Sequence, residues 1–478
     1  MEIVRCRCCG YLAEAEYLHQ LIDKDCPNCA CILLTSSQYN TRRACERLNR
    51  RTNIGYSLIK LKPRKPRKKI TYIEFYDKNA IENLCACLTN LPEQMVLVGI
   101  DEAELDRNIA IYESVFQERG QNIIFNKEIL SSWEPCEILP MLEKIVEKYD
   151  DCVFGITGGE ESIIYALGII KERYSKEKNI QVHRISIQDN VVHDCDMDGK
   201  TIENHTPALS VDENVAIYGG KVLYGNVDED LTYEWEMDDT FETDLENMWD
   251  ICKTYFKPWN KQIGAFKEIH ENGIEKNKGL TLEASPVEDK PYYMNPNVCR
   301  ELQLAGLVKV TVASDKSVTL VFKNQQVKRC LMQEGMVFEM KIYKTMRSLV
   351  NDDNQPLYND VVNGVQIDWD GKLADEGKEY CNTKNEIDVF AMHNMIPIFV
   401  SCKNRDYVEA DELYKLNTVA GRFGGKYAKK VLIIRKFASK KIEEMIVQRA
   451  KDMGIQIIYG DVIGDEEKLK ARLENVWK

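Results

Sequence analysis

The stretch NEIDVFAMHNMIPIFVSCK, residues 385–403, places two apolar runs on either side of a polar turn at His393-Asn394-Met395. Short β-branched and aromatic runs around such a turn are typical of a β-hairpin. Asp388 opens the first run, and Ser401 and Lys403 close the second. Alternate residues of a strand share a face, so Ser401 and Lys403 lie on one side of the sheet, and the hairpin returns them to the segment that holds Asp388.

The surrounding residues 334–478 predict a helix, a three-strand meander and a crossover helix, followed by two strands and two further helices. The expected helices lie at 334–350, 410–423 and 440–453, with a final one at the end of the chain, and the expected strands at 365–369, 386–393, 396–401, 431–435 and 455–459. This order of elements is the core order of restriction-endonuclease-like folds. The fold delivers an acid on one strand and an acid-x-Lys pair on the next.

The motif NEID…SCK and the following DELYKLNTVAGRFGGKYAKKVLII, residues 411–434, resemble the PD-(D/E)xK nuclease of CARF-linked CRISPR effectors. The resemblance implies that Asp388 is the main ligand of a catalytic Mn²⁺ or Mg²⁺ ion and Lys403 the catalytic cation. It also implies a further carboxylate, Glu339, on the preceding helix. Phosphodiester hydrolysis needs carboxylates to hold the metal, and a lysine beside it stabilises the developing charge.

Ser401 departs from the family pattern, because those nucleases carry Glu or Asp at that position. A serine hydroxyl has little affinity for a divalent cation. Either Glu339 and Glu386 replace the missing carboxylate, or Asp360 or Asp368 does, or the site is inactive.

Residues 70–200 alternate apolar strands with helical segments. Strands are expected at 70–75, 95–100, 122–125, 152–156 and 180–187, and helices at 79–91, 102–119, 135–149 and 162–174. Continuous apolar strands with helical crossovers predict a parallel sheet covered on both faces, which is a Rossmann-like domain.

Two polar loops follow strands of this sheet, at the edge where open parallel sheets bind ligands. Tyr76-Asp77-Lys78-Asn79 follows the first strand, and Thr157-Gly158-Gly159 with Ser162 follows the fourth. The paired glycines allow close approach of the backbone to a ligand. No GxGxxG motif is present, so the dinucleotide fingerprint does not apply.

The loop ITGGEES, residues 156–162, and the opening ITYIEFYDKNAIENLCACL, residues 70–88, resemble the CARF domain. CARF domains bind cyclic oligoadenylates as symmetric dimers. The resemblance implies a homodimer in which the two loops surround a cyclic oligoadenylate, with cyclic tetra-adenylate as the first choice. Glu160 and Glu161 depart from the family pattern, because many relatives carry a Thr or Asn and a Lys just after the paired glycines. Two carboxylates near phosphate are unfavourable.

Residues 1–40 predict a zinc ribbon, and residues 41–69 a basic linker. Cys6-x2-Cys9 and Cys26-Pro-Asn-Cys29 are spaced as four thiolate ligands of a structural Zn²⁺ ion. Cys8 and Cys31 allow a different choice of ligands. The linker is either a solvated spacer or a contact for a phosphate backbone.

Residues 201–289 are expected to connect the sensor to a winged-helix-like element at 290–333. Within the connection, residues 225–250 hold eleven acids and no Lys or Arg. Their Trp and Phe residues argue against plain disorder.

Composition favours a cytoplasmic protein with no membrane partner. Hydrophobic residues make up 44% of the chain and charged residues 29%, as in ordinary globular proteins. No apolar run is long enough to span a bilayer. The 17 cysteines, an odd number, suit a reducing compartment with metal ligands and buried thiols.

These features predict an α/β multidomain enzyme: a metal-dependent nuclease, activated by cyclic oligoadenylate, in type III CRISPR antiviral defence. Its substrate is DNA or RNA. The alternative is a ligand-responsive nucleic-acid-binding regulator with an inactive nuclease-like domain.

Overall fold

The computed structural model describes most of the chain from residue 70 onward. The described residues are 2–5, 12–15, 24, 27, 70–90, 92–119, 121, 123–149, 151–189, 191–195, 201–202, 208–225, 231–288, 290–371, 384–406 and 409–478. The predicted zinc ligands Cys6, Cys9, Cys26 and Cys29, and the basic linker 41–69, lie outside them. Strands β1 (Glu2–Arg5) and β2 (Leu12–Ala15) pair antiparallel.

The predicted Rossmann-like sensor domain, hereafter the sensor domain, is built on a seven-stranded sheet in the order β5-β4-β3-β6-β7-β8-β9. Its strands are β3 (Thr71–Phe75), β4 (Gln94–Gly99), β5 (Ile124–Ile129), β6 (Asp151–Gly155), β7 (Asn179–Ser186), β8 (Val191–Asp194) and β9 (Thr201–Ile202). The first five in this spatial order run parallel, which confirms the predicted parallel sheet. Strands β8 and β9, which the sequence did not predict, extend it antiparallel.

Helices cover both faces of this sheet, as the continuous apolar strands predicted. Helices α3 (Ala80–Asn90) and α4 (Glu102–Glu118) pack with Tyr72 and Leu97 on one face. Helices α5 (Pro135–Lys148) and α6 (Glu161–Tyr174) pack with Ile73 and Val96 on the other. Alternate residues of β3 and β4 therefore serve two cores.

The predicted nuclease domain, hereafter the nuclease domain, has a six-stranded sheet in the order β10-β15-β16-β17-β18-β19. The strands are β10 (Lys221–Leu223), β15 (Asp360–Asp368), β16 (Lys384–His393), β17 (Ile396–Lys403), β18 (Lys429–Ile434) and β19 (Ile455–Tyr459). The hairpin β16–β17 turns at Asn394, as predicted, and β17, β18 and β19 run parallel.

The nuclease helices also divide between the two faces of their sheet. Helix α12 (Met336–Ser348) and helix α16 (Glu466–Leu473), which follows the short helix α15 (Asp461–Gly464), share one core with Val389 and Val400. Helices α13 (Ala410–Gly424) and α14 (Lys440–Asp452) share another with Phe390 and Phe399. That second core is continuous with the α3–α4 face of the sensor, so the two domains are joined by buried apolar surface.

The described residues between 208 and 288 do more than connect domains. Helix α7 (Val211–Ile217) packs between the sensor and nuclease domains, and its Asn214 Nδ2 donates to the carbonyl oxygen of Phe423 at 2.6 Å. Strand β10 becomes the edge strand of the nuclease sheet by pairing with β15. Such pairing across more than 130 residues has no local sequence signal.

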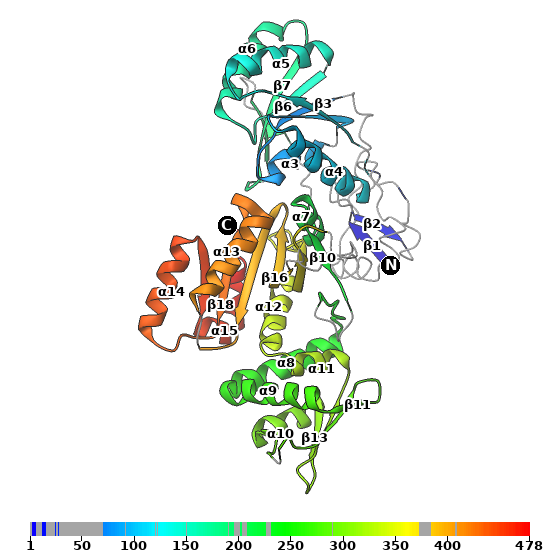
Figure 1. Ribbon diagram of the computed structural model, residues 1–478, viewed down its shortest axis with the longest axis vertical. Coiled ribbons are helices and arrows are strands. Elements are labelled where there is room, and N and C mark those ends of the chain that lie inside the picture. Colours follow the sequence, from blue (N-terminus) through cyan, green and yellow to red (C-terminus); the bar gives the residue numbers. More distant parts are fainter. Residues whose placement is uncertain are drawn as a thin grey trace.

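A small domain lies at the end of the molecule opposite the sensor, with the nuclease between them (Figure 1). It contains α8 (Asp239–Thr254), α9 (Phe256–Asn272), β11 (Ile274–Lys276), β12 (Thr281–Ala284), α10 (Pro296–Leu304), β13 (Val308–Val312), β14 (Val318–Phe322) and α11 (Gln325–Met332). The helix and hairpin expected in 290–333 are present as α10, β13 and β14, and β12 pairs with β14 to widen the sheet. The winged-helix-like assignment stays a prediction.

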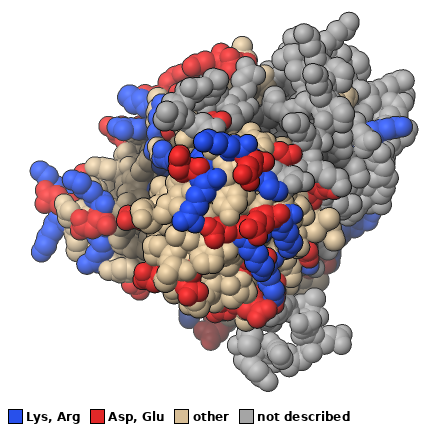
Figure 2. Space-filling model, turned by 90° about the horizontal axis from the view of Figure 1, so that it is seen from above, with Lys and Arg blue, Asp and Glu red and all other residues tan. Residues whose placement is uncertain are grey.

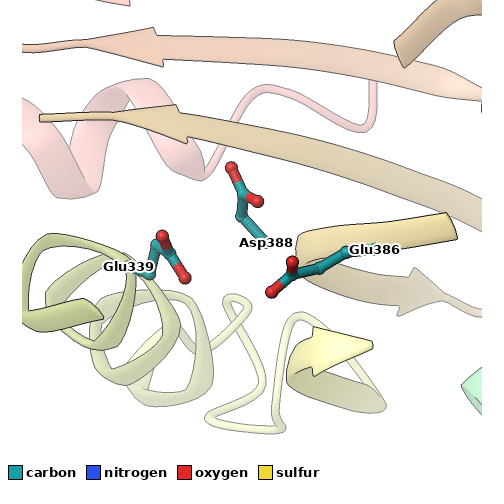
Figure 3. Close-up of side chains that lie close together, drawn as sticks. All are labelled: Glu339, Glu386 and Asp388. Carbon is teal, nitrogen blue, oxygen red and sulfur yellow. The ribbon is translucent and has the colours of Figure 1, made fainter. Parts of the chain in front are cut away.

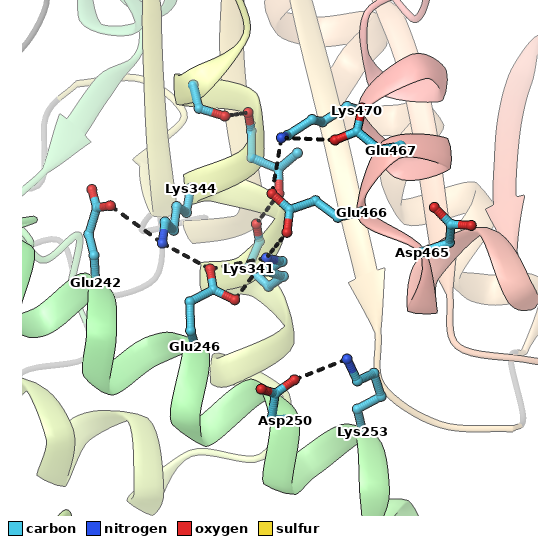
Figure 4. A network of polar contacts seen from close by, with 12 residues as sticks. Glu242, Glu246, Asp250, Lys253, Lys341, Lys344, Asp465, Glu466, Glu467 and Lys470 are labelled. Carbon is cyan, nitrogen blue, oxygen red and sulfur yellow. Dashed lines mark hydrogen bonds and ion pairs between the residues drawn. The ribbon is translucent and has the colours of Figure 1, made fainter. Parts of the chain in front are cut away.

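Two acidic residues of α8, Glu242 and Glu246, form ion pairs that join this domain to the nuclease domain (Figure 4). Lys341 of α12, almost fully buried, lies 3.0 Å from both carboxylate oxygens of Glu246 on α8. Lys344 lies 2.9 Å from Glu246 and 3.4 Å from Glu242. The network fixes α12, the helix that also carries Glu339.

Among the described residues, no helix is both long and apolar enough to cross a membrane.

Glu74 is a buried carboxyl at the centre of the sensor sheet. It is 1% exposed, and neither of its oxygens has a hydrogen-bond partner. Burial, with a smaller contribution from Glu82, raises the pKa of Glu74 well above its usual range. Gly155 of β6 makes room for the carboxyl, since a Cβ atom there would lie 2.1 Å from Glu74 Oε1.

We expect Glu74→Gln to stabilise the sensor sheet more at pH 8 than at pH 5. The pKa of Glu74 is raised in the folded state. The contribution of this carboxyl group to stability is therefore greatest below its unfolded-state pKa and is lost as pH rises through its folded-state pKa. Removing the charge should increase the opening free energy of the β3 amides by about 1–3 kcal/mol at pH 8, measured by hydrogen exchange. Glu113→Gln, at an exposed position of α4, is the control. An equal gain at both pH values would contradict this account.

Candidate active site

The hairpin β16–β17 brings together the three residues that the sequence singled out. Val389 pairs with Val400, so Asp388 stands opposite Ser401 one residue further along. Asp388 Oδ2 accepts hydrogen bonds from Ser401 Oγ at 3.2 Å, from the Cys402 backbone N–H at 2.5 Å and from Lys403 Nζ at 3.3 Å. The hairpin therefore holds the Asp388 carboxylate in one orientation.

The neighbouring strand β15 is distorted where it passes Asp388. The β15–β16 register is the same on both sides of Gly364, but the pair that Gly364 would form with Asp388 is missing. The intervening Gly364 has φ +57°, a left-handed conformation that favours glycine. Asn363 Nδ2 instead donates to the carbonyl oxygen of Asp388 at 3.0 Å, so a side chain supports the backbone here.

Three carboxylates meet at this corner of the sheet (Figure 3). Glu339 enters from the first turn of α12, and Glu386 and Asp388 come from one face of β16. One oxygen from each of the three lies within 4.8 Å of the others. The predicted carboxylates Glu339 and Glu386 are thus beside Asp388, as the first of the alternatives to Ser401 required.

The other carboxylates considered for that role lie elsewhere. Asp360 Oδ2 accepts from the Val211 backbone N–H at 2.9 Å and so serves the start of α7. Asp368, at the far end of β15, is fully buried and is not among the three described carboxylates that gather here.

Glu339 is the buried member of the cluster. Its side chain is 7% exposed, and Oε2 has no hydrogen-bond partner. Burial raises the pKa of Glu339 well above its usual range, and Asp388 and Glu386 raise it further against the opposing effect of Lys403. An all-oxygen set with one unsatisfied buried carboxylate fits a hard divalent cation such as Mn²⁺ or Mg²⁺.

Lys403 is held between two acids. Its Nζ lies 3.3 Å from Asp388 and 3.5 Å from Glu412, which is in the first turn of α13. Burial opposes the charge, but the two carboxylates outweigh it and raise the pKa of the Lys403 ammonium. The side chain therefore remains a cation beside the carboxylate cluster.

A cavity of about 380 Å³ opens over these groups. It is lined by Asn385, Glu386, Ile387, Asp388, Val400, Ser401, Lys403, Glu412, Lys415, Leu416 and Val419. Sequence reasoning missed Glu412 and Lys415. The signal was present, because the two residues stand one helical turn apart in the helix directly after Lys403.

The two predicted sensor loops lie side by side at the edge of the sensor sheet. A Cβ atom at Gly158 would lie 3.0 Å from Cβ of Asp77, and Gly159 has φ +91° against Phe75. Asp77 Oδ1 accepts from the backbone and side-chain amides of Asn79 at 2.7 and 2.8 Å, which orders the first loop. The predicted residues Tyr76 to Asn79 and Thr157 to Gly159 are therefore adjacent.

Several side chains of these loops form hydrogen bonds to other parts of the sensor domain. Tyr76 OH donates to Glu104 at 2.9 Å, Thr157 Oγ1 accepts from the Ile185 backbone N–H at 3.0 Å, and Ser162 Oγ donates to the Trp133 carbonyl at 2.7 Å. Lys78 is exposed.

Figure 2 views the molecule from the sensor end and shows basic and acidic side chains interspersed over that face. Within the sensor domain, oppositely charged side chains pair with one another, as Lys144 does with Glu128 at 3.0 Å. No single sign of charge therefore dominates the part of this face that the structure describes.

The comparison with known protein families concerns the nuclease domain. Residues 326–478 match the Card1-like endonuclease domain. This match confirms the predicted resemblance to a nuclease for these residues. A search of curated protein sequences gave no match.

Two solved structures share the fold of nearly the whole chain. Protein VC1899 from Vibrio cholerae is 14% identical, with a TM-score of 0.64, over 85% of this chain and 99% of that one. Can2 from Sulfobacillus thermosulfidooxidans, solved in complex with cyclic tetra-adenylate, is 15% identical, with a TM-score of 0.58, over 86% and 99%. Both likenesses concern the fold.

We expect Glu339→Gln to stabilise the metal-free protein and to weaken Mn²⁺ binding. The substitution removes a buried charge that faces two other carboxylates, and should raise Tm by about 2–4 °C. Saturating Mn²⁺ should raise the Tm of the wild type, since a ligand stabilises the state that binds it, but should move the variant little.

Differential scanning fluorimetry with and without Mn²⁺ measures both effects. Asp352→Asn, at an exposed position after α12, should match the wild type. A variant that is destabilised, or that keeps the full Mn²⁺ shift, would argue against a metal held by Glu339.

Proposed function

We propose that the chain is a divalent-metal-dependent nuclease, activated by a cyclic oligoadenylate, that acts as a homodimer in type III CRISPR defence. The observation that carries the catalytic part is the cluster of Glu339, Glu386 and Asp388 beside Lys403. These three carboxylates would hold a Mn²⁺ or Mg²⁺ ion, which when bound polarises a phosphate oxygen and lowers the pKa of water.

The chain's own residues have distinct parts in this proposal. Lys403 presents an ammonium to the negative charge that develops on the phosphate. Asp388 and Glu412 fix that ammonium from two sides. The cavity over the cluster, about 380 Å³ in volume, admits a segment of nucleic-acid backbone.

The ligand part of the proposal is supported by the sensor fold and its loops. The adjacent loops at the C-terminal ends of β3 and β6 are where open parallel sheets bind phosphate-bearing ligands. Can2, which has the same overall fold, was solved with cyclic tetra-adenylate. We infer cyclic tetra-adenylate as the activator of this chain.

A direct contact links the sensor loop to the nuclease domain. Asn79 Oδ1, at the end of the first loop, accepts from the Lys426 backbone N–H at 3.2 Å. Glu82, in the first turn of α3, accepts from Tyr427 OH at 2.6 Å and pairs with Lys426 Nζ at 2.7 Å.

Lys426 and Tyr427 belong to the 3-10 turn Gly425–Tyr427, which directly follows α13. The same helix carries Glu412, the partner of Lys403. A ligand that binds one arrangement of the first loop better than another therefore has a physical route to the catalytic lysine.

We expect Asp388→Asn and Lys403→Ala to reduce cleavage at least about 100-fold. Plasmid DNA and labelled RNA, incubated with cyclic tetra-adenylate and Mn²⁺, provide the measurement. Asp411→Asn, at an exposed position in the first turn of α13, should cleave like the wild type. If the wild type binds duplex DNA in a gel shift but cuts neither substrate, the regulator with an inactive nuclease-like domain is the correct account.

We expect Tyr427→Phe to weaken activation and to leave basal cleavage unchanged. The variant loses the hydrogen bond to Glu82, which joins the sensor helix to the turn after α13. The ratio of cleavage with and without cyclic tetra-adenylate should fall about 5-fold or more. Tyr414→Phe, at an exposed position of α13, is the matched control, and an unchanged ratio in Tyr427→Phe would exclude this contact as the route.

A further inference from the structure

Lys415 is a second lysine of the active-site cavity, and the proposed chemistry does not use it. It lies on α13 one turn after Glu412 and lines the same cavity as Asp388 and Lys403. Its side chain is exposed. Across the described part of the chain, Lys415 has no hydrogen-bond or ion-pair partner, whereas Lys403 has two acidic partners.

The cavity carries more acidic than basic groups, so a lysine without an acidic partner there affects how strongly a polyanion is repelled. Glu386, Asp388 and Glu412 line it, Glu339 lies behind, and Lys403 is the one lining cation that these acids engage. One divalent ion would not neutralise this excess of acids. A polyanionic backbone therefore meets repulsion at the mouth of the cavity unless another cation attracts it.

The position of Lys415 is fixed relative to the catalytic lysine. Glu412 ties the first turn of α13 to Lys403, and Lys415 follows about 4.5 Å further along the helix axis. Its flexible stem then places an ammonium to one side of the carboxylate cluster. Lysine binds phosphate as a point charge and reads no base.

We propose that Lys415 binds the phosphate next to the one that is cleaved, and so positions the nucleic-acid strand across the carboxylate cluster. The proposal rests on the nuclease function proposed above. Its ligand is the phosphodiester backbone of DNA or RNA. Lys415 acts in binding the strand, whereas Lys403 acts at the reacting phosphate.

Lys415→Ala should raise KM about 10-fold and change kcat little, because one phosphate contact is worth a tenfold change or less in binding. The slope of log KM against log salt concentration should fall by about 1. Lys415→Arg should keep most of the wild-type KM. Lys441→Ala, at an exposed position of α14 outside the cavity, is the matched control.

The deciding experiment removes the charge from the substrate. Oligonucleotides carry a neutral methylphosphonate at the linkage on one side or the other of the scissile phosphate. At one of the two positions the wild type should lose about 10-fold in kcat/KM, and Lys415→Ala should lose nothing further there.

Equal sensitivity of wild type and Lys415→Ala at both positions would overturn the role of Lys415. An unchanged KM and an unchanged salt slope in Lys415→Ala would also overturn it. In either case, cleavage by the wild type would leave the proposed nuclease function intact. A wild type that cleaves no substrate with Mn²⁺ and cyclic tetra-adenylate would overturn the proposed function and this inference together.

Discussion

Three carboxylates held together against their mutual repulsion are the constraint on which the nuclease domain depends. Asp388 is fixed by three hydrogen bonds from the adjoining strand, and Glu339 is buried without a partner for Oε2. Such a cluster costs stability in the absence of a cation, and functional sites commonly carry that cost. The surrounding structure keeps it in place: α12 is clamped by ion pairs to α8, and β16 is supported by Asn363.

A series of contacts through α13 connects the sensor domain to the carboxylate cluster. Glu412 of α13 holds Lys403 against the cluster, and the turn after α13 rests on Asn79 and Glu82 of the sensor. The two domains also share one buried core through α7. A helix packed on both sides in this way would move as a unit. The proposed activation therefore requires a rearranged loop of the sensor domain to displace Glu412, the partner of Lys403.

Sequence reasoning predicted the parts of the fold and site that local pattern controls. Apolar periodicity placed the parallel sensor strands, and the turn at Asn394 fixed the hairpin that aligns Asp388 with Ser401 and Lys403. It did not place strand β10 in the nuclease sheet, because that pairing is long-range. It also missed Glu412. The position of Glu412 in the helix directly after Lys403 shows only that the two residues are near in the chain, and the packing of α13 on the sheet turns the Glu412 side chain toward Lys403.

Anomalous diffraction from crystals soaked in manganese tests the central claim most directly. The account predicts an anomalous peak within bonding distance of carboxylate oxygens from Glu339, Glu386 and Asp388. It also predicts that the peak disappears in crystals of Asp388→Asn. Fully occupied manganese elsewhere in the nuclease domain, with no peak among these three side chains, would contradict it.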